Sequence, residues 1–383
     1  MKKLRVLIFS ATFGAGHVRA AEAIFEAIRA QEPSTEIIHL DFGEFLNKTI
    51  NKVIKNTYIE LIKYTPKLWG KFYYRTSKIS PDSVFQRLLN RLGRRDFLEY
   101  ILSLQPDLII CTYPTVAGVL AQLRSVQALS IPVVTVVTDY AIHSQWIHAG
   151  VDLYIVGCQD VCDGLISRGI EKNRIKVTGI PVSPRFEIPL ERHSLYQKFD
   201  LEAERFTVLV MGGAYGVLGG AKLISKIIAE SQARIQAVIV CGRDEKLFKS
   251  LDPVIAEARI PIRRLGYVRN VEELMTVADV IITKAGGLTV SEALTKRLPM
   301  VIYKPIPGQE EANAFFVQKI GAGLVADNSD NLEEIITRLI SQPQELKSMC
   351  LAAEKSFAGH SAEQAADNIL KLIEEQKIVQ KIG

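Results

Sequence analysis

Cysteine and histidine are scarce in this chain of 383 residues, which holds five cysteines and six histidines. The cysteines are odd in number and scattered, and Cys111 and Cys241 lie in apolar runs typical of strands. We therefore expect reduced, buried thiols and a cytosolic compartment rather than a disulfide framework. Cys158 and Cys162 lack the spacing and the second ligand pair of a zinc site, so the sequence predicts no metal centre.

Long apolar runs and a strong net charge are also missing. The basic residues at the start precede only Val6–Phe9, which is too short for the apolar core of a signal peptide. No run approaches the length of a membrane span. The net charge is +5, with 48% hydrophobic and 23% charged residues, so attraction to anions must come from local clusters. These features predict a soluble or peripherally membrane-bound protein of the cytoplasm.

The dinucleotide-binding fingerprint G-x-G-x-x-G is absent as well. Arg5–Ser10 is an apolar run typical of a buried parallel strand, and a glycine loop with Gly14 and Gly16 leads from it into a helix. Arg19 stands where the third glycine would be. His17 lies where the helix opens, and it is either a base that faces a cleft or a capping or surface histidine. The positive potential of the helix end should lower the pKa of His17 and keep its imidazole neutral.

Residues 48–95 interrupt the alternation of strands and helices. They hold twelve basic residues against two acidic ones, with seven aromatic residues interleaved. From Pro81 onward the spacing predicts an amphipathic helix, with Phe85 and Leu88 on one face and Arg87 and Arg91 on another. Such a segment suits an anionic bilayer surface. The charge would also suit nucleic acid, but no nucleic-acid-binding motif is present, and a solvated face of ordinary helices is the remaining alternative.

The alternation then resumes and predicts a first doubly wound parallel sheet. Its expected strands, besides Arg5–Ser10, are Glu36–Asp41, Asp107–Thr112, Val133–Thr138, Leu153–Val156 and Ile175–Thr178. Ligands bind such sheets at the carboxyl ends of the strands, so Tyr113–Thr115 and Thr138–Tyr140 should join His17 at one edge. Asp139 would orient a base or an acceptor hydroxyl there, or else cap the segment that follows it.

A proline-rich link at residues 179–186 and a charged stretch mark a domain boundary. We expect a first domain over 1–184, a linker over 185–205, a second domain over 206–360, and a helix over 361–383 that packs back across the junction. The second domain repeats the doubly wound pattern, with expected strands Phe206–Met211, Ile235–Cys241, Ile262–Leu265, Val280–Thr283, Met300–Tyr303 and Gly323–Ala326. Two Rossmann-like α/β domains that face each other across a cleft form the GT-B arrangement.

The second domain carries the clearest binding signals. Gly286 and Gly287 follow one strand and open a helix, where unpaired backbone donors and a partial positive charge suit phosphate. Glu292 lies one turn inside, where a carboxylate would take the two hydroxyls of a sugar. The next strand leads to a stiff loop that ends in Gln309 and Glu310, amide and carboxylate groups suited to hydroxyls. The two neighbouring strand ends predict a nucleotide-sugar site.

These motifs resemble a known family. The segments are Ile282–Thr289 with Glu292 and Ala293, Tyr303–Glu310, Gly179–Val182 and Phe13–His17. Together they are similar to the processive diacylglycerol β-glucosyltransferases of Gram-positive bacteria, in glycosyltransferase family 28 with the plant monogalactosyldiacylglycerol synthases. The resemblance spans essentially the whole chain. It implies an inverting GT-B enzyme that uses UDP-glucose without a metal ion, and that glucosylates diacylglycerol and then its glucolipid product at the membrane surface.

The resemblance also implies roles for individual residues. His17 would be the base, with Asp139 as the second candidate. The remaining site residues would bind the donor: Gly212, Gly213, Gly286, Gly287 and Thr289 at the diphosphate, Glu292 at the ribose, the backbone of Val268 at the uracil, and Gln309 and Glu310 at the sugar hydroxyls. The glycines of the first loop, Gly14 and Gly16, would let the backbone approach a ligand closely.

Other functions share these features. A nucleotide-sugar sensor that regulates a partner would need the same donor residues, although a full set of site residues argues for turnover. A UDP-sugar epimerase, or transfer to a polyprenyl acceptor, would keep the fold, and the basic aromatic segment disfavours the soluble substrate of an epimerase. Glucose and galactose remain open as the donor sugar, because one hydroxyl orientation near Gln309 and Glu310 decides between them.

Overall fold

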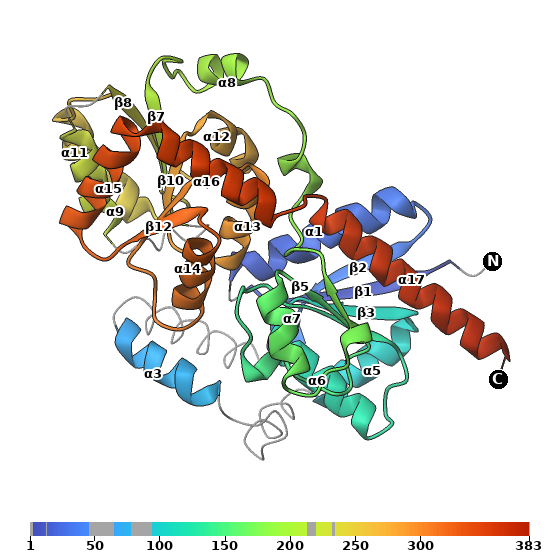
Figure 1. Cartoon of the computed structure of the whole chain (residues 1–383). Helices are drawn as coiled ribbons and strands as arrows, with labels where there is room; N and C mark the ends of the chain where they lie inside the picture. The colour runs from blue at the N-terminus through green and yellow to red at the C-terminus, as the bar shows by residue number, and fades with distance from the viewer. Residues whose placement is uncertain are drawn as a thin grey trace. The chain divides into compact units, whose positions relative to one another are not determined.

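The chain folds into two units, and the computed structural model describes residues 3–12, 14–45, 65–77, 94–212, 220–231 and 234–382. Residues 1–184 and 359–383 form the first unit, and residues 185–358 form the second. Each unit is a parallel sheet with helices on its faces (Figure 1). The predicted α/β fold with two doubly wound domains is therefore confirmed. The cleft predicted between the two domains stays a prediction.

The first unit is built on a six-stranded sheet with the order β2-β1-β3-β4-β5-β6, all parallel. The strands are β1 (Arg5–Ser10), β2 (Glu36–Asp41), β3 (Leu108–Cys111), β4 (Val133–Val136), β5 (Leu153–Val156) and β6 (Ile175–Val177). Among the described residues, the helices of this unit are α1 (Ala15–Gln31), α3 (Pro66–Thr76), α5 (Arg94–Leu104), α6 (Pro114–Ser125), α7 (Gln159–Ile166) and α17 (Ser361–Ile382). Short 3-10 turns η1 (Phe42–Phe45), η2 (Ser144–Trp146) and η3 (Lys172–Arg174) connect some of them.

Alternation along the strands decides which helices cover which face. On β1, Leu7 and Phe9 enter the core with α5, α6 and α7, while Val6 and Ile8 enter the core with α1 and α17. Successive side chains of a strand point to opposite faces, so a strand that is covered on both sides must be apolar throughout. The continuous apolar run of β1 is thus the direct cause of its central position.

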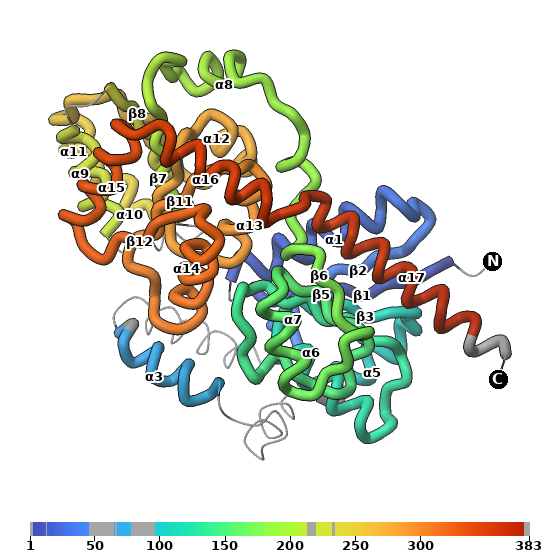
Figure 2. The backbone as a smooth tube through the Cα atoms, in the orientation of Figure 1, coloured from blue at the N-terminus to red at the C-terminus, as the bar shows by residue number. Residues whose placement is uncertain are grey.

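The C-terminal helix α17 belongs to the first unit and lies along α1 (Figure 2). Ala362, Ala365, Ala366 and Ile369 of α17 are fully or almost fully buried, in one core with Ile24 of α1. Small alanine side chains let the two helices approach closely. The segment that we expected to pack back across the junction therefore completes the hydrophobic core of the N-terminal unit.

The second unit has six parallel strands in the order β12-β11-β10-β7-β8-β9. They are β7 (Phe206–Met211), β8 (Ile235–Val240), β9 (Ile262–Leu265), β10 (Val280–Thr283), β11 (Met300–Tyr303) and β12 (Gly323–Ala326). The helices are α8 (Arg192–Lys198), α9 (Ala221–Ala229), α10 (Glu245–Ser250), α11 (Asp252–Ala256), α12 (Val271–Val277), α13 (Gly287–Thr295), α14 (Gln309–Lys319), α15 (Ser329–Ser341) and α16 (Pro343–Ser356). The residues expected to form a linker, 185–205, include α8, which packs on this unit.

Several expectations concern details of this fold. All five cysteines are free thiols, as expected, but Cys158 and Cys350 are only half-buried, because each lies at the surface end or side of a helix. The helix expected from Pro81 lies outside the described residues. Within the described part of the chain, no helix combines the length and the apolar character needed to cross a bilayer.

Candidate functional site

His17 stands at the carboxyl end of the first sheet, in the first turn of α1. Its Nδ1 atom lies 2.7 Å from the carbonyl oxygen of Thr112, which follows β3, and 3.0 Å from Oγ1 of Thr138, which follows β4. In return, Thr112 Oγ1 donates to the His17 carbonyl oxygen at 2.8 Å. The predicted edge thus brings His17 together with the ends of β3 and β4. The imidazole is held by two residues that lie far from it in the sequence.

These contacts determine which ring nitrogen carries the proton. A carbonyl oxygen only accepts hydrogen bonds, so His17 Nδ1 donates to Thr112 and Nε2 keeps its lone pair. Burial lowers the pKa of His17 to about 4, against a smaller opposing effect of the Thr112 hydrogen bond. The imidazole is therefore neutral near pH 7, as predicted. The largest cause is burial of the ring.

Gly14 lies beside the unprotonated edge of His17. A β-carbon at position 14 would lie 3.5 Å from His17 Cδ2 and 3.9 Å from Nε2. The backbone of Gly14 is extended, with φ −150° and ψ 132°, so its conformation does not demand glycine. The missing side chain instead means that no β-carbon packs against Cδ2 and Nε2 from this position. Gly16 lies in the first turn of α1, and Phe13 lies outside the described residues.

Asp139 is half-buried and follows Thr138 directly. We considered that it would cap a following segment, but the next helical turn, η2, is capped by His143, whose side chain accepts from the Gln145 N–H. The Asp139 carboxylate lies close enough to Tyr73 of α3 to reinforce the effect of burial, which raises the pKa of the Tyr73 phenol. Asp139 therefore lies between the His17 edge and α3.

Helix α3 is the part of the basic aromatic segment that the structure describes, together with residues 65, 77, 94 and 95. One stripe, Trp69, Gly70, Tyr73 and Thr76, is half-buried or buried. Leu68, Phe72 and Tyr74 are exposed at 56%, 51% and 48%. Three exposed basic residues, Lys67, Lys71 and Arg75, lie among them. The outward face of α3 thus combines apolar and cationic side chains.

In the second unit, the predicted phosphate loop lies between β10 and α13. Gly286 is the N-cap of α13 and Gly287 its first residue, so the first backbone N–H groups of the helix lack intrahelical partners. A β-carbon at Gly286 would lie 4.0 Å from Thr289 Oγ1, which places that hydroxyl beside the loop. Glu292 is half-buried one turn further on. The loop is firmly held, because Thr283 Oγ1 donates to the Met211 carbonyl oxygen at 2.6 Å.

Glu310 has a more specific environment than the sequence indicated. Its Oε1 lies 2.9 Å from Lys284 Nζ, and its Oε2 accepts from the Ile306 N–H at 3.1 Å. The Glu310 side chain is 7% exposed and that of Lys284 27%. Both oxygens are engaged, so Glu310 ties the loop before α14 to the loop before α13. A direct contact between Glu310 and a sugar stays a prediction.

Two further features fix the start of α14, where Gln309 is the first residue. Asn313 is fully buried, and its Nδ2 donates to the Ala285 carbonyl oxygen at 2.9 Å. Gly308 has φ 107° and ψ −121°, a conformation open only to glycine. Sequence reasoning had assigned no role to Lys284 or Asn313. Lys284 stands inside the quoted motif Ile282–Thr289, and that position was the only signal for it, whereas Asn313 follows the motif Tyr303–Glu310.

The ends of β8 and β9 meet where Val268 was predicted to bind a base. A β-carbon at Gly266 would lie 3.9 Å from the Gly242 carbonyl oxygen. The Arg243 guanidinium lies 4.8 Å from the centre of the Tyr267 ring. Val268, half-buried, follows directly. Gly212 follows the last residue of β7 at the same edge of the sheet, whereas Gly213 lies outside the described residues.

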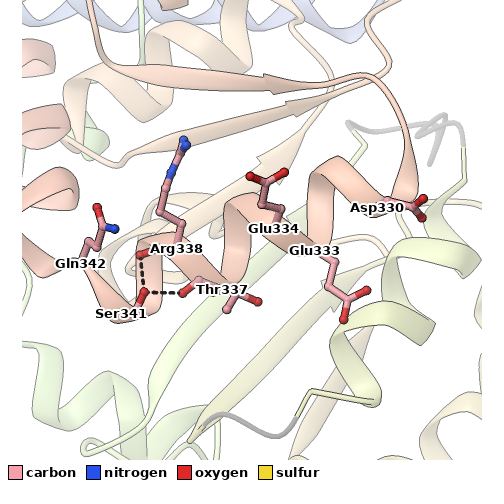
Figure 3. Close-up of a pocket in the computed structure, with 7 residues that line it drawn as sticks. All are labelled: Asp330, Glu333, Glu334, Thr337, Arg338, Ser341 and Gln342. Atoms are coloured by element: carbon pink, nitrogen blue, oxygen red, sulfur yellow. Dashed lines mark hydrogen bonds between the residues drawn. The ribbon is translucent and has the colours of Figure 1, made fainter.

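A groove of about 480 Å³ lies elsewhere in the second unit (Figure 3). It runs along α15 and is lined by Asp330, Glu333, Glu334, Thr337, Arg338, Ser341 and Gln342. Ser341 Oγ donates to the carbonyl oxygens of Thr337 and Arg338, so the hydroxyl hydrogen of this serine is used within its own helix. None of the predicted site residues lines this groove.

Two family models match the chain. The model for monogalactosyldiacylglycerol (MGDG) synthase covers residues 17–182, and that for the glycosyltransferase family 28 C-terminal domain covers residues 207–369. Among solved structures, MurG of Acinetobacter baumannii has a TM-score of 0.63 at 17% identity, over 96% of this chain and 99% of that one. A UDP-GlcNAc 2-epimerase of Neisseria meningitidis bound to UDP-GlcNAc has a TM-score of 0.64 at 14% identity, over 96% and 100%. At these identities the structures establish the fold alone, which is GT-B.

Curated relatives are closer in sequence. The processive diacylglycerol beta-glucosyltransferase of Bacillus subtilis (strain 168) is 32% identical over 379 residues, 98% of this chain and 97% of the relative. The enzyme of the same name from Bacillus pumilus is 31% identical over 368 residues, 96% and 94%. Both similarities run through the two units. The chain therefore belongs to the family of the processive diacylglycerol β-glucosyltransferases.

Proposed function

We propose that this protein transfers glucose from UDP-glucose to the hydroxyl of diacylglycerol, with inversion at the anomeric carbon, and then to the glucosyl-diacylglycerol product. The observation that supports this most directly is the neutral His17 at the carboxyl end of the first sheet, where the Nδ1 contact with Thr112 leaves Nε2 unprotonated. The relatives named as diacylglycerol glucosyltransferases supply the substrate classes.

In the proposed reaction the acceptor hydroxyl attacks the anomeric carbon from the side opposite UDP. The new carbon–oxygen bond forms as the bond to the diphosphate oxygen breaks, and UDP leaves with the electron pair. His17 Nε2 takes the hydroxyl proton, a contribution of typically about 10²–10⁴-fold in rate. The Nδ1–H bond to Thr112 then stabilises the imidazolium that forms. Asp139 is the second candidate for this proton.

The second unit would hold the donor. Backbone N–H groups at Gly286 and Gly287, with the Thr289 hydroxyl, would bind the diphosphate and stabilise its growing charge without a metal ion. The remaining contacts would come from Glu292 at the ribose, Val268 at the uracil, and Gln309 at the sugar, with Gly212 near the diphosphate. Lys284, held by Glu310, adds a cation between the starts of α13 and α14.

The lipid acceptor places the reaction at a membrane, and we propose that α3 docks on the anionic cytoplasmic surface. Leu68, Phe72 and Tyr74 would enter the interface, while Lys67, Lys71 and Arg75 contact the headgroups. Each well-placed basic residue contributes about 1 kcal/mol at such a surface. The protein would thus bind the membrane peripherally.

The decisive experiment is incubation with diacylglycerol in anionic or neutral vesicles and with UDP-glucose or UDP-galactose, followed by separation of the glycolipids. We expect product from UDP-glucose, more of it on anionic vesicles, and no loss when EDTA is added. Product from UDP-galactose alone would instead make the chain a galactosyltransferase, as the synthase model over the first unit allows. If neither donor yields glycolipid, the proposal fails.

Charge reversal tests the membrane contact separately. The double variant K71E/R75E should bind anionic vesicles at least about tenfold more weakly, since two attractive charges become repulsive. The matched control K172E/K176E reverses two exposed lysines elsewhere in the first unit and should bind like the wild type. Equal losses in both variants would show a general charge effect and contradict docking through α3.

A further inference from the structure

The turn η2 contacts both α3 and the surroundings of His17. On one side, Ser144 Oγ donates to the Thr76 carbonyl oxygen at 2.9 Å, and this carbonyl belongs to the last turn of α3. On the other side, the Trp146 ring, 2% exposed, lies 6.3 Å from the His17 ring, centre to centre. Three consecutive residues therefore connect the helix with the exposed apolar face to the predicted base.

His143, which precedes η2, contacts two residues of α3. Its ring centre lies 4.7 Å from that of Tyr73, and its Nε2 lies 3.2 Å from Thr76 Oγ1 and 3.3 Å from the Tyr73 carbonyl oxygen. The side chain is 6% exposed. A buried polar group in this position contributes most when both of its ring nitrogens have partners.

The two nitrogens of His143 have different roles. The Gln145 N–H donates to Nδ1 at 3.2 Å, so Nδ1 carries no proton and Nε2 is the N–H donor. Burial lowers the pKa of His143, which favours this neutral form. Nδ1 thus caps η2, and the Nε2 proton is donated to the end of α3. The Tyr73 carbonyl oxygen also accepts from the Ser77 N–H at 2.8 Å, so Nε2 adds a further donor at this end of α3.

We propose that His143 is a positioning residue for the lipid acceptor: through Nε2 it fastens α3 to η2 and so fixes the membrane-facing helix relative to His17. This inference rests on the proposed function. The connection runs through Thr138, which contacts His17 Nδ1 and lies five residues before His143. Loss of the Nε2 contact should leave the donor site in the second unit unchanged and weaken only the use of diacylglycerol.

Two amide substitutions separate the roles of the two nitrogens. In H143N the side-chain oxygen takes the place of Nδ1 and still caps η2, because asparagine is a strong N-cap, but the side chain is too short to reach α3. In H143Q the amide nitrogen reaches the place of Nε2 and can donate to the Tyr73 carbonyl oxygen, while the cap is lost. H143A removes both contacts.

The measurements are KM for diacylglycerol in anionic vesicles, KM for UDP-glucose, and backbone hydrogen exchange of residues 66–77. We expect H143N and H143A to raise KM for diacylglycerol about tenfold, the equivalent of roughly one to two hydrogen bonds, and to leave KM for UDP-glucose within twofold. Amide exchange at the end of α3 should become faster in the same two variants. H143Q should resemble the wild type in all three measurements.

A second pair of variants tests the partner. T76V removes the hydroxyl 3.2 Å from His143 Nε2 and should raise KM for diacylglycerol a few-fold, and T76S should restore it. The proposal is overturned if H143N and H143Q behave alike, or if H143Q alone is impaired, since the cap would then be the important contact. Equal changes in both KM values would also overturn it. Hydrogen exchange tests the fastening of α3 even if no glycolipid forms, so failure of the proposed function is distinguishable.

Discussion

The two sheet edges hold their polar residues by contacts of very different sequence range. At the edge of the first unit, His17 is bonded to Thr112 and Thr138, which lie 95 and 121 residues further along the chain. At the edge of the second unit, the bond from Lys284 to Glu310 spans 26 residues and that from Asn313 to Ala285 spans 28. The first edge is assembled from distant segments. At the second edge these two bonds lie within residues 284–313, although the Thr283 bond to Met211, which spans 72 residues, also ties the loop to a distant strand.

The largest expected effect concerns the first edge. H17A should lower kcat by about 10²–10⁴-fold while UDP binding in the second unit stays within twofold, because the base is lost and the donor site is not. H17N is the matched variant: its amide nitrogen can still donate to the Thr112 carbonyl oxygen, but nothing replaces Nε2. Steady-state kinetics and calorimetric UDP titration measure the two quantities. If H17N keeps a tenth or more of wild-type kcat, His17 is not the base.

This comparison explains which parts of the site could be predicted. The central strands were readable because they are buried on two faces and therefore largely apolar, whereas β2, β6 and β9 carry charged residues and are less buried. The α13 loop was readable because Gly286, Gly287 and Glu292 are close in sequence. The proton position on His17 could not be predicted, because it depends on the distant Thr112. The contact of α3 with His143 could not be predicted either, because hydrogen bonds between distant segments leave no local pattern in the sequence.

The Lys284–Glu310 pair provides the next largest effect, at the second edge. K284M removes the ammonium partner of the buried Glu310 carboxylate and leaves it the hydrogen bond from the Ile306 N–H. This loss should lower the free energy of unfolding by about 1–3 kcal/mol. UDP-glucose should also bind at least about tenfold more weakly, because a cation is lost and the loop before α14 loosens. Thermal melts and donor titration are the measurements.

The matched variants for this pair distinguish charge from shape. E310Q should be milder than K284M, because the amide oxygen can still accept from Ile306 and Lys284 is partly exposed. K284M/E310Q should recover much of the stability that K284M loses, since no buried charge is left. If K284M and E310Q are equally harmful and the double variant is worse than either, the pair acts through packing and not through charge.

Glu292 provides a smaller effect at the same edge. E292A should weaken UDP binding about tenfold, equivalent to 1.4 kcal/mol, if the carboxylate takes ribose hydroxyls. The sharper measurement compares UDP with 2′-deoxy-UDP: the wild type should prefer UDP, and E292A should lose most of that preference. E292Q, which keeps an acceptor oxygen, should lie between them. An equal loss of affinity for both nucleotides would contradict the ribose contact.

The smallest expected effect is an absence of pH dependence at the first edge. The pKa of His17 is lowered to about 4, so its base form is complete near neutral pH, and protonation at this group should leave kcat flat from pH 8 to about pH 5.5. The lowered pKa of His17 also affects the stability of the fold. Its stabilising contribution is fully present above pH 6.5, the pKa in the unfolded chain, and is lost as the pH falls through 4. Between these pH values only the unfolded chain binds the proton. The contrary result would be a fall of kcat at acid pH with a midpoint near 6.5, while the thermal melts show no change of stability at that pH. It would mean that His17 is solvated when it acts as the base. The first edge would then be less closely packed than its contacts with Thr112 and Thr138 imply.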